Sequence, residues 1–406
     1  MTTNALNYSS LFAKDIPPPS TPSEEAPIYN FTYGHGSPDL LPIEGFVESA
    51  SRVFKNDGRS LAVYSANGGS LGYLPLREFL VEKLAKHRGI NVTPDEVLIT
   101  SGSQQGIVMI MDAFLEPGDT VITELFSYAG TLGNLRRHGA EIVGIPLDED
   151  GMQTDVLETT LSDLQTKGVK PKFIYTIPTL HNPTGTVMSM KRRHEILRIS
   201  RKYHVPIFED ECYGDLVFER EYEHAIRSLD DSNYVLHVGS FSKSLAPGVR
   251  LGYVVAPWEV MSQLLPFKLD IGTSTMGQMI VADFFQNNFD SHMEHLKSGL
   301  RRKRDTLIAA LGEHFGPSVE PNEPRGGMFL WVKFPEGVDT RKALEAAKQE
   351  SVAYNPGSDW AVYATEDDKN GNNYMRLCYA LPTEDEIWQG VERLARAFQK
   401  GVGFPQ

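Results

Sequence analysis

The stretch "HVGSFSKSLAPGVRLGYVV", residues 237–255, places Lys243 between two serines, after an apolar run and before a Pro-Gly turn. An ammonium group at the end of a buried strand is costly to desolvate unless a partner or a reaction uses it. Ser240 and Ser242 place hydroxyl groups beside it, and Arg250 follows in the same stretch. Hydroxyl and guanidinium donors are the groups that hold a doubly negative anion, so this stretch predicts an anion site beside a reactive amine.

Short apolar segments lie on both sides of this stretch along the chain. Strands are expected over residues 95–103, 120–125, 140–147, 172–179, 205–212, 234–241 and 251–257, and helices over 75–89, 104–115 and 191–204. Apolar strands that alternate with helices are typical of an α/β fold with a mostly parallel sheet sandwiched by helices. Functional residues are then expected at the carboxyl ends of the strands.

The C-terminal part has a different pattern. After about residue 290 a long helical run leads to further elements, expected at 326–334 (strand), 340–350 (helix), 374–381 (strand) and 384–400 (helix). We expect a smaller α+β domain that the long helix connects to the main sheet. The expected division is an N-terminal arm at 1–29, a small domain at 30–65 and 300–406, and a large domain at 66–299.

Composition limits the classes of protein. A chain of 406 residues is longer than one hydrophobic core usually supports, in agreement with two domains. The net charge of -14 argues against a nucleic-acid partner. Cys212 and Cys378 are the two cysteines, and neither lies in a metal-binding or disulfide pattern. The N-terminal sequence does not resemble a secretion signal and no run is long enough for a membrane helix. We expect a cytoplasmic protein without a metal or a membrane partner.

Three short motifs stand at predicted strand ends, namely "HNPTG" (181–185), "EDECYGD" (209–215) and "SFSK" (240–243). Each alone is a weak signal, since Asn-Pro-Thr-Gly is first of all a turn sequence. Together they supply an amine for an aldehyde, a carboxylate for a pyridinium nitrogen and donors for a phenolate oxygen. The "SGSQQG" turn (101–106) opens a helix and adds donors for a phosphate. This set matches the needs of pyridoxal phosphate.

With these motifs the chain resembles the fold-type-I pyridoxal-phosphate enzymes, and among them the class I/II aminotransferases of the 2-aminoadipate/kynurenine type. The resemblance covers most of residues 30–400 and rests on "SFSKSLAPGVRLGY" and on the order of the three motifs. It implies a large cofactor-binding domain with a seven-stranded sheet, and a small domain built from both termini. It also implies a homodimer with shared active sites.

The resemblance implies a role for each matching residue. Lys243 forms the internal aldimine, Asp210 pairs with the pyridine nitrogen, and Asn182 and Tyr213 contact the phenolic oxygen. The remaining cofactor contacts are Ser103, Gln104, Ser240, Ser242 and Arg250 for the phosphate, Tyr128 on the ring face, and Tyr64 for the phosphate of the neighbouring subunit. Gly34, Asn182 and Arg376 are the substrate residues, with Arg376 holding the α-carboxylate. The segment around Tyr64 departs from the family pattern, so Tyr73 is its rival.

The expected function is transamination between an L-amino acid and a 2-oxo acid, with Lys243, Asp210 and Tyr213 as the catalytic residues. The alternative is another fold-type-I reaction on an amino acid, by a decarboxylase, lyase, C–C bond-forming synthase or oxidase in specialised metabolism. A transcription regulator with an aminotransferase-like domain is disfavoured by the short polar segment before residue 30. Since no arginine precedes Arg52, we expect an aromatic or otherwise uncharged substrate side chain.

Overall fold

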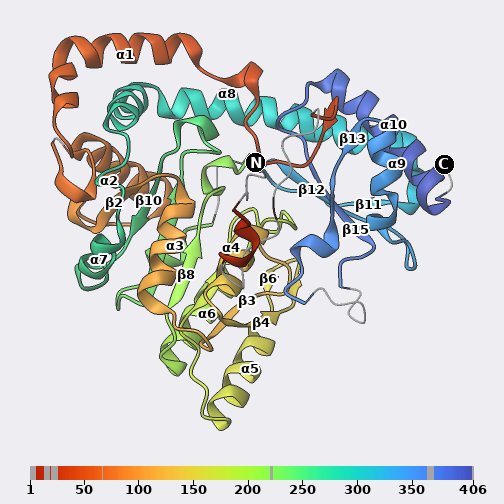
Figure 1. Cartoon of the computed structure of the whole chain (residues 1–406), viewed down its shortest axis with the longest axis horizontal. Helices are drawn as coiled ribbons and strands as arrows, with labels where there is room; N and C mark the ends of the chain where they lie inside the picture. Colours follow the sequence, from red (N-terminus) through yellow and green to blue (C-terminus); the bar gives the residue numbers. More distant parts are fainter. Residues whose placement is uncertain are drawn as a thin grey trace, which may run out of the picture.

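A computed structural model gives the structure of the chain and describes residues 6–12, 19, 26–65, 67–219, 223–363 and 370–404. Its centre is a seven-stranded sheet of order β2-β10-β9-β8-β7-β3-β4 (Figure 1). The strands are β2 (Val97–Thr100), β3 (Thr120–Glu124), β4 (Glu141–Ile145), β7 (Ile174–Thr176), β8 (Ile207–Asp210), β9 (Val235–Ser240) and β10 (Gly252–Val255). β10 runs antiparallel to both of its neighbours, and the other described pairs are parallel. The prediction of a mostly parallel seven-stranded sheet is confirmed.

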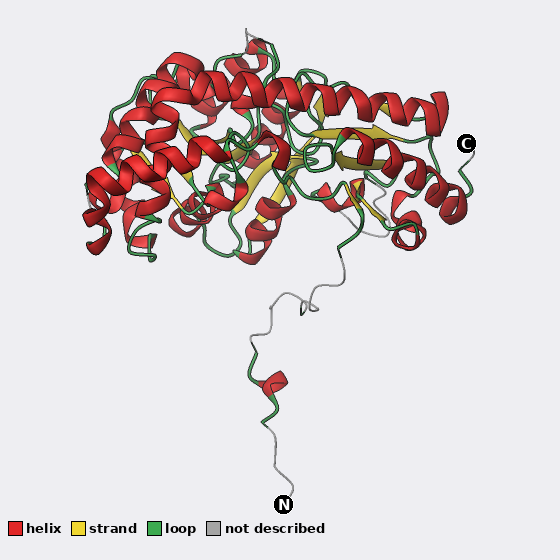
Figure 2. Cartoon of the chain, turned by 90° about the horizontal axis from the view of Figure 1, so that it is seen from above, coloured by secondary structure: helices red, strands yellow, loops and turns green. Residues whose placement is uncertain are grey.

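Helices cover both faces of this sheet, as Figure 2 shows. They are α2 (Leu74–Arg88), α3 (Ser103–Phe114), α4 (Ala129–Arg137), α5 (Thr154–Thr166), α6 (Met190–Tyr203) and α7 (Trp258–Leu264). Successive side chains of a strand point to opposite faces, so each strand contributes to two cores. Ile174 and Ile207 belong to a core with residues of α5 and α6, whereas Tyr175 and Phe208 belong to the core on the other face. This double burial explains why the strands read as continuous apolar runs.

A second sheet, of order β11-β12-β15-β14, occupies the C-terminal part. Its strands are β11 (Glu320–Pro321), β12 (Phe329–Lys333), β14 (Asn355–Pro356) and β15 (Tyr374–Cys378), and α9 (Leu344–Gln349) and α10 (Glu384–Val402) accompany it. Two short pairs complete the described strands, β1 (Tyr29–Asn30) with β13 (Val352–Ala353) and β5 (Leu147–Asp148) with β6 (Gly151–Met152). The β1–β13 pair joins an N-terminal segment to the C-terminal part of the chain.

The long helix α8 (Thr275–Phe315) runs from the main sheet to the second sheet (Figure 1). It begins at Thr275, earlier than the expected position near residue 290, and the Ser274 side chain caps it by accepting from Gly277 N. The prediction missed its first part because apolar residues there are buried on several sides and show no amphipathic pattern. The prediction also missed α1 (Ile43–Asp57), which packs on α8 where Gly45 leaves room for the ring of Phe284.

Two predicted elements differ in detail from the structure. The strand expected over 140–147 is divided into β4 and β5. The helix expected over 340–350 begins as a 3-10 turn, Thr340–Ala343, and continues as α9. Among the residues that the structure describes, no helix is both long and apolar enough to cross a membrane.

Candidate active site

A cavity of about 690 Å³ lies where strands of the main sheet end and the second sheet begins. Asp210 at the end of β8 and Ser240 at the end of β9 line one side, and Phe329 of β12 and Arg376 of β15 line the other. The predicted site residues that line this cavity are Gly34, Ser103, Gln104, Tyr128, Asn182, Asp210, Tyr213, Ser240, Ser242, Lys243, Arg250 and Arg376. The fold therefore brings together every predicted site residue except Tyr64.

The amine of Lys243 faces the backbone of a distant segment. Its Nζ atom donates a hydrogen bond of 2.6 Å to the carbonyl oxygen of Gly34. A Cβ atom at Gly34 would lie 2.9 Å from this Nζ atom and 3.0 Å from the ring of Phe329, so the close approach requires glycine. Burial lowers the pKa of Lys243 from its ordinary value. The structure thus favours the neutral amine, which is the form that can accept a proton.

Asp210 is a buried carboxylate at the wall of the cavity, only 4% exposed. Its Oδ2 atom accepts a hydrogen bond of 2.7 Å from the hydroxyl of Tyr175, and its Oδ1 atom accepts one of 3.3 Å from Cys212 N. Burial raises the pKa of Asp210. The hydrogen-bond donors to it among the described residues are neutral, which leaves the carboxylate suited to a cationic group from a ligand.

Arg376 connects three segments at the opposite wall. Its guanidinium donates to Asn182 Oδ1 and to Asn355 Oδ1, both at 2.9 Å, and contacts the carbonyl oxygen of Thr32. The amide Nδ2 of Asn182 in turn donates to the hydroxyl of Tyr213 at 3.4 Å. Asn182 is thereby oriented with its amide nitrogen toward Tyr213 and its oxygen toward Arg376.

The guanidinium of Arg376 also lies between two aromatic rings. Its central carbon is 4.0 Å from the ring centroid of Phe329 and 4.0 Å from that of Trp360, which belongs to the 3-10 turn Gly357–Trp360. Burial lowers the pKa of Arg376 to about 10, so the group remains a cation at neutral pH. A buried, stacked guanidinium of this kind is suited to a carboxylate ligand. Sequence reasoning missed the residues that hold it, because no motif marks Asn355 or Trp360.

An anion site forms at the start of α3. Gly102 precedes the helix with a φ of 77°, and a Cβ atom there would lie 2.6 Å from Nη2 of Arg250. Arg250 itself has a left-handed backbone, and its guanidinium donates to the carbonyl oxygens of Ser101 and Pro247, both at 3.4 Å. The free amides of a helix N-terminus and a guanidinium beside them are a common phosphate-binding arrangement.

A second group of residues supports this helix start, and the sequence did not indicate it. The carboxylate of Asp270 accepts from Ser101 Oγ at 3.1 Å and from Gln105 Nε2 at 3.0 Å. Lys268 Nζ forms an ion pair of 2.9 Å with the same carboxylate and donates to Thr273 at 2.8 Å. The loop around Asp270 therefore holds the anion site from behind.

Tyr64 does not reach the cavity of its own chain. Its side chain is 83% exposed, and its rival Tyr73 does not line the cavity either. The neighbouring Ser65 Oγ donates to the carbonyl oxygen of Ile271 at 3.0 Å, so the Tyr64 segment lies against the loop that follows Asp270.

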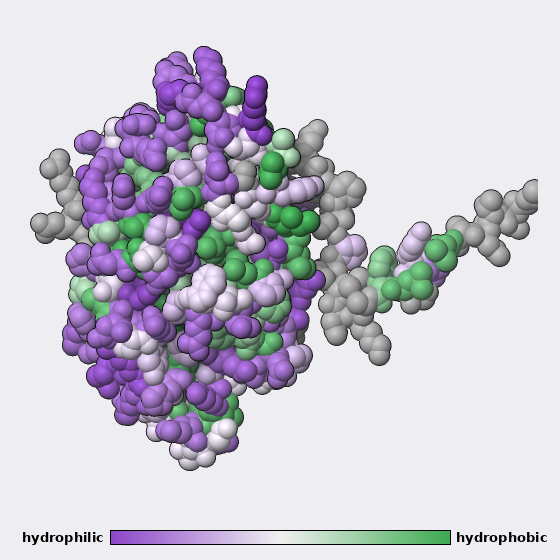
Figure 3. Space-filling view, turned by 90° about the vertical axis from the view of Figure 1, so that its left-hand side faces the viewer, coloured by the Kyte–Doolittle hydropathy of each residue, from purple (hydrophilic) through white to green (hydrophobic). Residues whose placement is uncertain are grey.

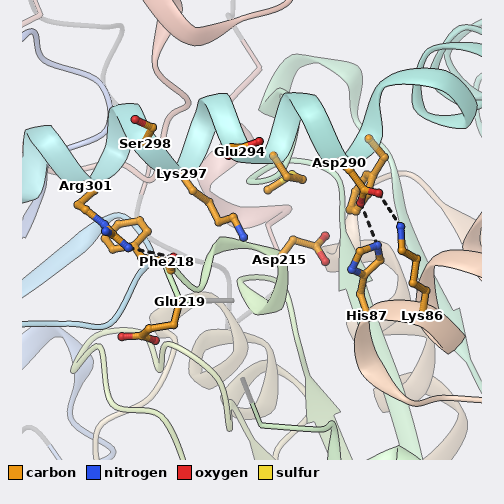
Figure 4. Close-up of a pocket in the computed structure, with 12 residues that line it drawn as sticks. Lys86, His87, Asp215, Phe218, Glu219, Asp290, Glu294, Lys297, Ser298 and Arg301 are labelled. Atoms are coloured by element: carbon orange, nitrogen blue, oxygen red, sulfur yellow. Dashed lines mark hydrogen bonds and ion pairs between the residues drawn. The ribbon is translucent and has the colours of Figure 1, made fainter. Parts of the chain in front are cut away.

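A different cavity, of about 520 Å³, lies between α2, α8 and the segment after β8 (Figure 4). No predicted site residue lines it. Its charged groups largely contact one another or the backbone, since Lys86 and His87 pair with Asp290 at 2.5 and 3.2 Å and Arg301 donates to the carbonyl oxygen of Phe218. The figure shows Lys297 extending from α8 in the direction of Asp215. We therefore assign the active site to the larger cavity.

The larger cavity fits pyridoxal phosphate on the features of this chain. The buried carboxylate of Asp210 suits the protonated ring nitrogen. The hydroxyl of Tyr213 and the amide of Asn182 suit the ring oxygen. The space left at Gly102 beside Arg250 suits the phosphate. Lys243 supplies the amine.

Comparisons with known proteins agree with this site. A family model described as aminotransferase class I and II matches residues 33–394. An aromatic-amino-acid aminotransferase of Thermococcus litoralis is 34% identical over 93% of this chain and 89% of that protein. The solved structure of an alpha-aminoadipate aminotransferase from Thermus thermophilus, complexed with N-(5'-phosphopyridoxyl)-L-leucine, has a TM-score of 0.84, 31% identity and 93% coverage of both chains. A kynurenine aminotransferase structure from Pyrococcus horikoshii has a TM-score of 0.86 and 32% identity, and covers 93% of this chain and 92% of that one.

Proposed function

Since the chain belongs to the class I and II aminotransferases and is a pyridoxal-phosphate-dependent transaminase, we propose that the residues of the larger cavity carry out the reaction. The observation that carries the assignment is the meeting of Lys243, Asp210 and Arg376 in one cavity, although they come from three distant segments. When bound, pyridoxal phosphate supplies a ring that withdraws electrons from the substrate Cα atom.

In this proposal each wall of the cavity holds one part of the cofactor. Asp210 binds the ring nitrogen, and Asn182 and Tyr213 donate to the ring oxygen. Tyr128 covers the ring face. The phosphate contacts are Ser103, Gln104, Ser240, Ser242 and Arg250.

Lys243 moves the proton. The lowered pKa of Lys243 favours a neutral Nζ atom, which accepts the proton that leaves the substrate Cα atom. The carbonyl oxygen of Gly34, at 2.6 Å, holds the amine in position in the absence of substrate. Gly34 also leaves room above the amine, because a side chain there would contact Nζ.

Arg376 binds the α-carboxylate of the substrate. The rings of Phe329 and Trp360 fix the plane of the guanidinium, and the amide oxygens of Asn182 and Asn355 fix its rotation. A bidentate pair with a carboxylate needs this fixed plane. The amino group of the substrate is then directed toward Lys243.

We propose an aromatic or otherwise uncharged side chain for the preferred amino donor. Among the described residues that line the cavity, Lys, Arg and His are represented by Lys243, Arg250, Arg376 and His35, and the first three have roles in the proposal. Asp359 also lines it and pairs with Arg341, so a second substrate carboxylate would meet a negative group. The aromatic residues Tyr33, Phe329 and Trp360 provide apolar contact area instead.

The test is a panel of amino donors with 2-oxoglutarate or pyruvate as the acceptor. The purified protein with added pyridoxal phosphate is expected to convert aromatic donors with a higher kcat/KM than aspartate or 2-aminoadipate. Lys243→Ala is the control, and it should lose the visible absorbance of the bound cofactor and nearly all turnover. Normal turnover by Lys243→Ala would contradict the role of this lysine, and a preference for dicarboxylic donors would contradict the substrate class.

We also propose that the protein is a homodimer with shared active sites. Val63, Tyr64, Leu269, Ile271 and Met276 are exposed apolar or aromatic side chains on and near two adjoining loops. On the face that carries α1, α2 and α7, Figure 3 shows apolar atoms in patches among polar ones. Apolar patches of this kind are typical of surfaces that a partner covers. A second copy on this surface would let Tyr64 reach the phosphate of the partner's site.

The cellular location is a proposal as well. Cys212 and Cys378 are free, in agreement with a reducing compartment such as the cytoplasm. The substrates are small molecules, and the net charge of -14 does not favour a nucleic-acid partner.

A further inference from the structure

Tyr175 stands behind the carboxylate of Asp210, and no sequence motif singled it out. It is the central residue of β7, its side chain is fully buried, and it does not line the cavity. Its hydroxyl donates to Asp210 Oδ2 at 2.7 Å. The same hydroxyl oxygen accepts a hydrogen bond of 3.1 Å from Oγ1 of Thr131, which belongs to α4 and is fully buried.

The direction of these hydrogen bonds is fixed. A phenol has a single hydroxyl proton, and because Thr131 donates to the oxygen, that proton is directed at Asp210. The ring of Tyr175 is held edge-on against Phe208 of β8, with 5.4 Å between ring centroids. Tyr175 and Phe208 are also register partners in the parallel β7–β8 pair. The hydroxyl therefore has little freedom to turn away.

The hydroxyl acts on the charge of Asp210. Burial raises the pKa of Asp210, whereas the hydrogen bond from Tyr175 lowers it. The pKa of Tyr175 lies well above its ordinary value because of burial, so this group stays protonated and serves only as a donor. The other titratable groups that act on Asp210 or are affected by it are Glu211, Cys212, Tyr128 and Tyr213.

We propose that Tyr175, oriented by Thr131, is a positioning residue that keeps Asp210 ionised and directed at the cationic ring nitrogen of the cofactor. The inference rests on the proposed role of Asp210. It adds a chain from α4 through β7 to β8, in which two neutral hydroxyl groups hold the charge on which the cofactor's electron withdrawal depends.

The test is the affinity of the cofactor-free protein for pyridoxal phosphate, followed by visible absorbance across a range of pH. Tyr175→Phe is expected to raise the Kd about tenfold at neutral pH, the effect of losing one hydrogen bond to a charged group. Its affinity should also begin to fall at a higher pH on acidification, because Asp210 then takes up a proton more easily. Thr131→Val keeps the phenol but removes its orienting donor, and should shift both quantities in the same direction by less.

The matched control is Tyr379→Phe, which removes another buried tyrosine hydroxyl, hydrogen-bonded to the carbonyl oxygen of Gly326 at 3.1 Å outside the cavity. It should keep the wild-type Kd, whatever it does to the melting temperature. A wild-type Kd and pH profile for both Tyr175→Phe and Thr131→Val would overturn the inference. Asp210→Asn identifies the level of a failure, because an unchanged Kd in that variant would overturn the role of Asp210 itself.

Discussion

Burial decides how the ionisable side chains of the cavity behave. Removal from water favours the neutral form of each group, so the pKa of Lys243 is lowered and the pKa of Asp210 is raised. For Lys243 this effect helps the proposed reaction, because a neutral amine can accept a proton. For Asp210 it acts against the proposed function, which explains why neutral donors surround that carboxylate. Arg376 loses little, since its pKa of about 10 still leaves it charged.

A second buried carboxylate, Glu124 at the end of β3, gives a prediction for stability against pH. Its contacts are Thr176 Oγ1 and Ile177 N, and burial raises its pKa to about 7 from 4.5. The unfolded chain ionises this group at lower pH, so the wild type should lose stability relative to Glu124→Gln as the pH rises from about 4.5 to about 7. The difference should approach about 3 kcal/mol and stay constant above pH 7.

The measurement is urea unfolding of both proteins at several pH values between about 4 and 8. Only the difference between the two proteins is compared, so that the titration of other groups cancels. A difference that does not change over this range would show that Glu124 keeps an ordinary pKa in the folded protein.

At the scale of elements, the site depends on where strands end and where one helix begins. β8 and β9 end side by side and deliver Asp210 and Ser240 to the same edge of the sheet. The start of α3 faces this edge because Gly102 adopts a φ of 77° that other residues rarely adopt. The anion site is therefore a property of the turn before the helix as much as of its side chains.

Gly102→Ala tests this anion site. The new methyl group would meet the guanidinium of Arg250 at 2.6 Å, so the Kd for pyridoxal phosphate is expected to rise tenfold or more (about 1.4 kcal/mol). Gly118→Ala is the matched control, because Gly118 also has a positive φ, of 92°, but has no atom within 4 Å of the new Cβ position.

Both alanine variants should lose about 1–2 kcal/mol of folding stability from backbone strain. Chemical denaturation measures that loss, and absorbance titration measures the Kd. Equal Kd values for the two variants would show that the space at Gly102 does not serve the cofactor.

Elements also differ in how well the sequence predicts them. The strands of the main sheet were found because burial on both faces makes them apolar throughout. α1 and the first part of α8 were missed, since their environment is set by contact with each other and not by a repeating pattern. Asn355 and Trp360 were missed for a related reason, because only the packing of the second sheet against the main sheet places them beside Arg376.

At the scale of the whole molecule, the cavity lies between two sheets that α8 connects. The main sheet lies within residues 97–255 and the four-stranded sheet within residues 320–378. This arrangement supports the proposed division into a large domain at 66–299 and a small domain at 30–65 and 300–406. Most of the proposed arm at 1–29 lies outside the described residues.

The proposed dimer makes a prediction about mixed subunits. Tyr64→Ala removes a group that would serve the partner's site, and Lys243→Ala removes one that serves its own site. Each variant alone should have little activity. A dimer with one copy of each variant would contain one complete site, so mixing under conditions of subunit exchange should restore activity to about a quarter of the wild-type value or less.

The oligomeric state is measured in parallel by analytical ultracentrifugation. A mixture of two Lys243→Ala preparations, treated in the same way, is the control and should remain inactive. Failure of the mixture to regain activity despite measured subunit exchange would contradict the shared site, and a monomeric wild type would contradict the dimer.

The sequence by itself determined the local features. The order of "HNPTG", "EDECYGD" and "SFSK" identified the cofactor-binding residues, because each motif combines a turn with a reactive side chain at a strand end. Only the tertiary structure decided the distances between them and the groups behind them. Tyr175, Thr131 and Trp360 act through contacts between elements far apart in the chain, and such contacts leave no local pattern in the sequence.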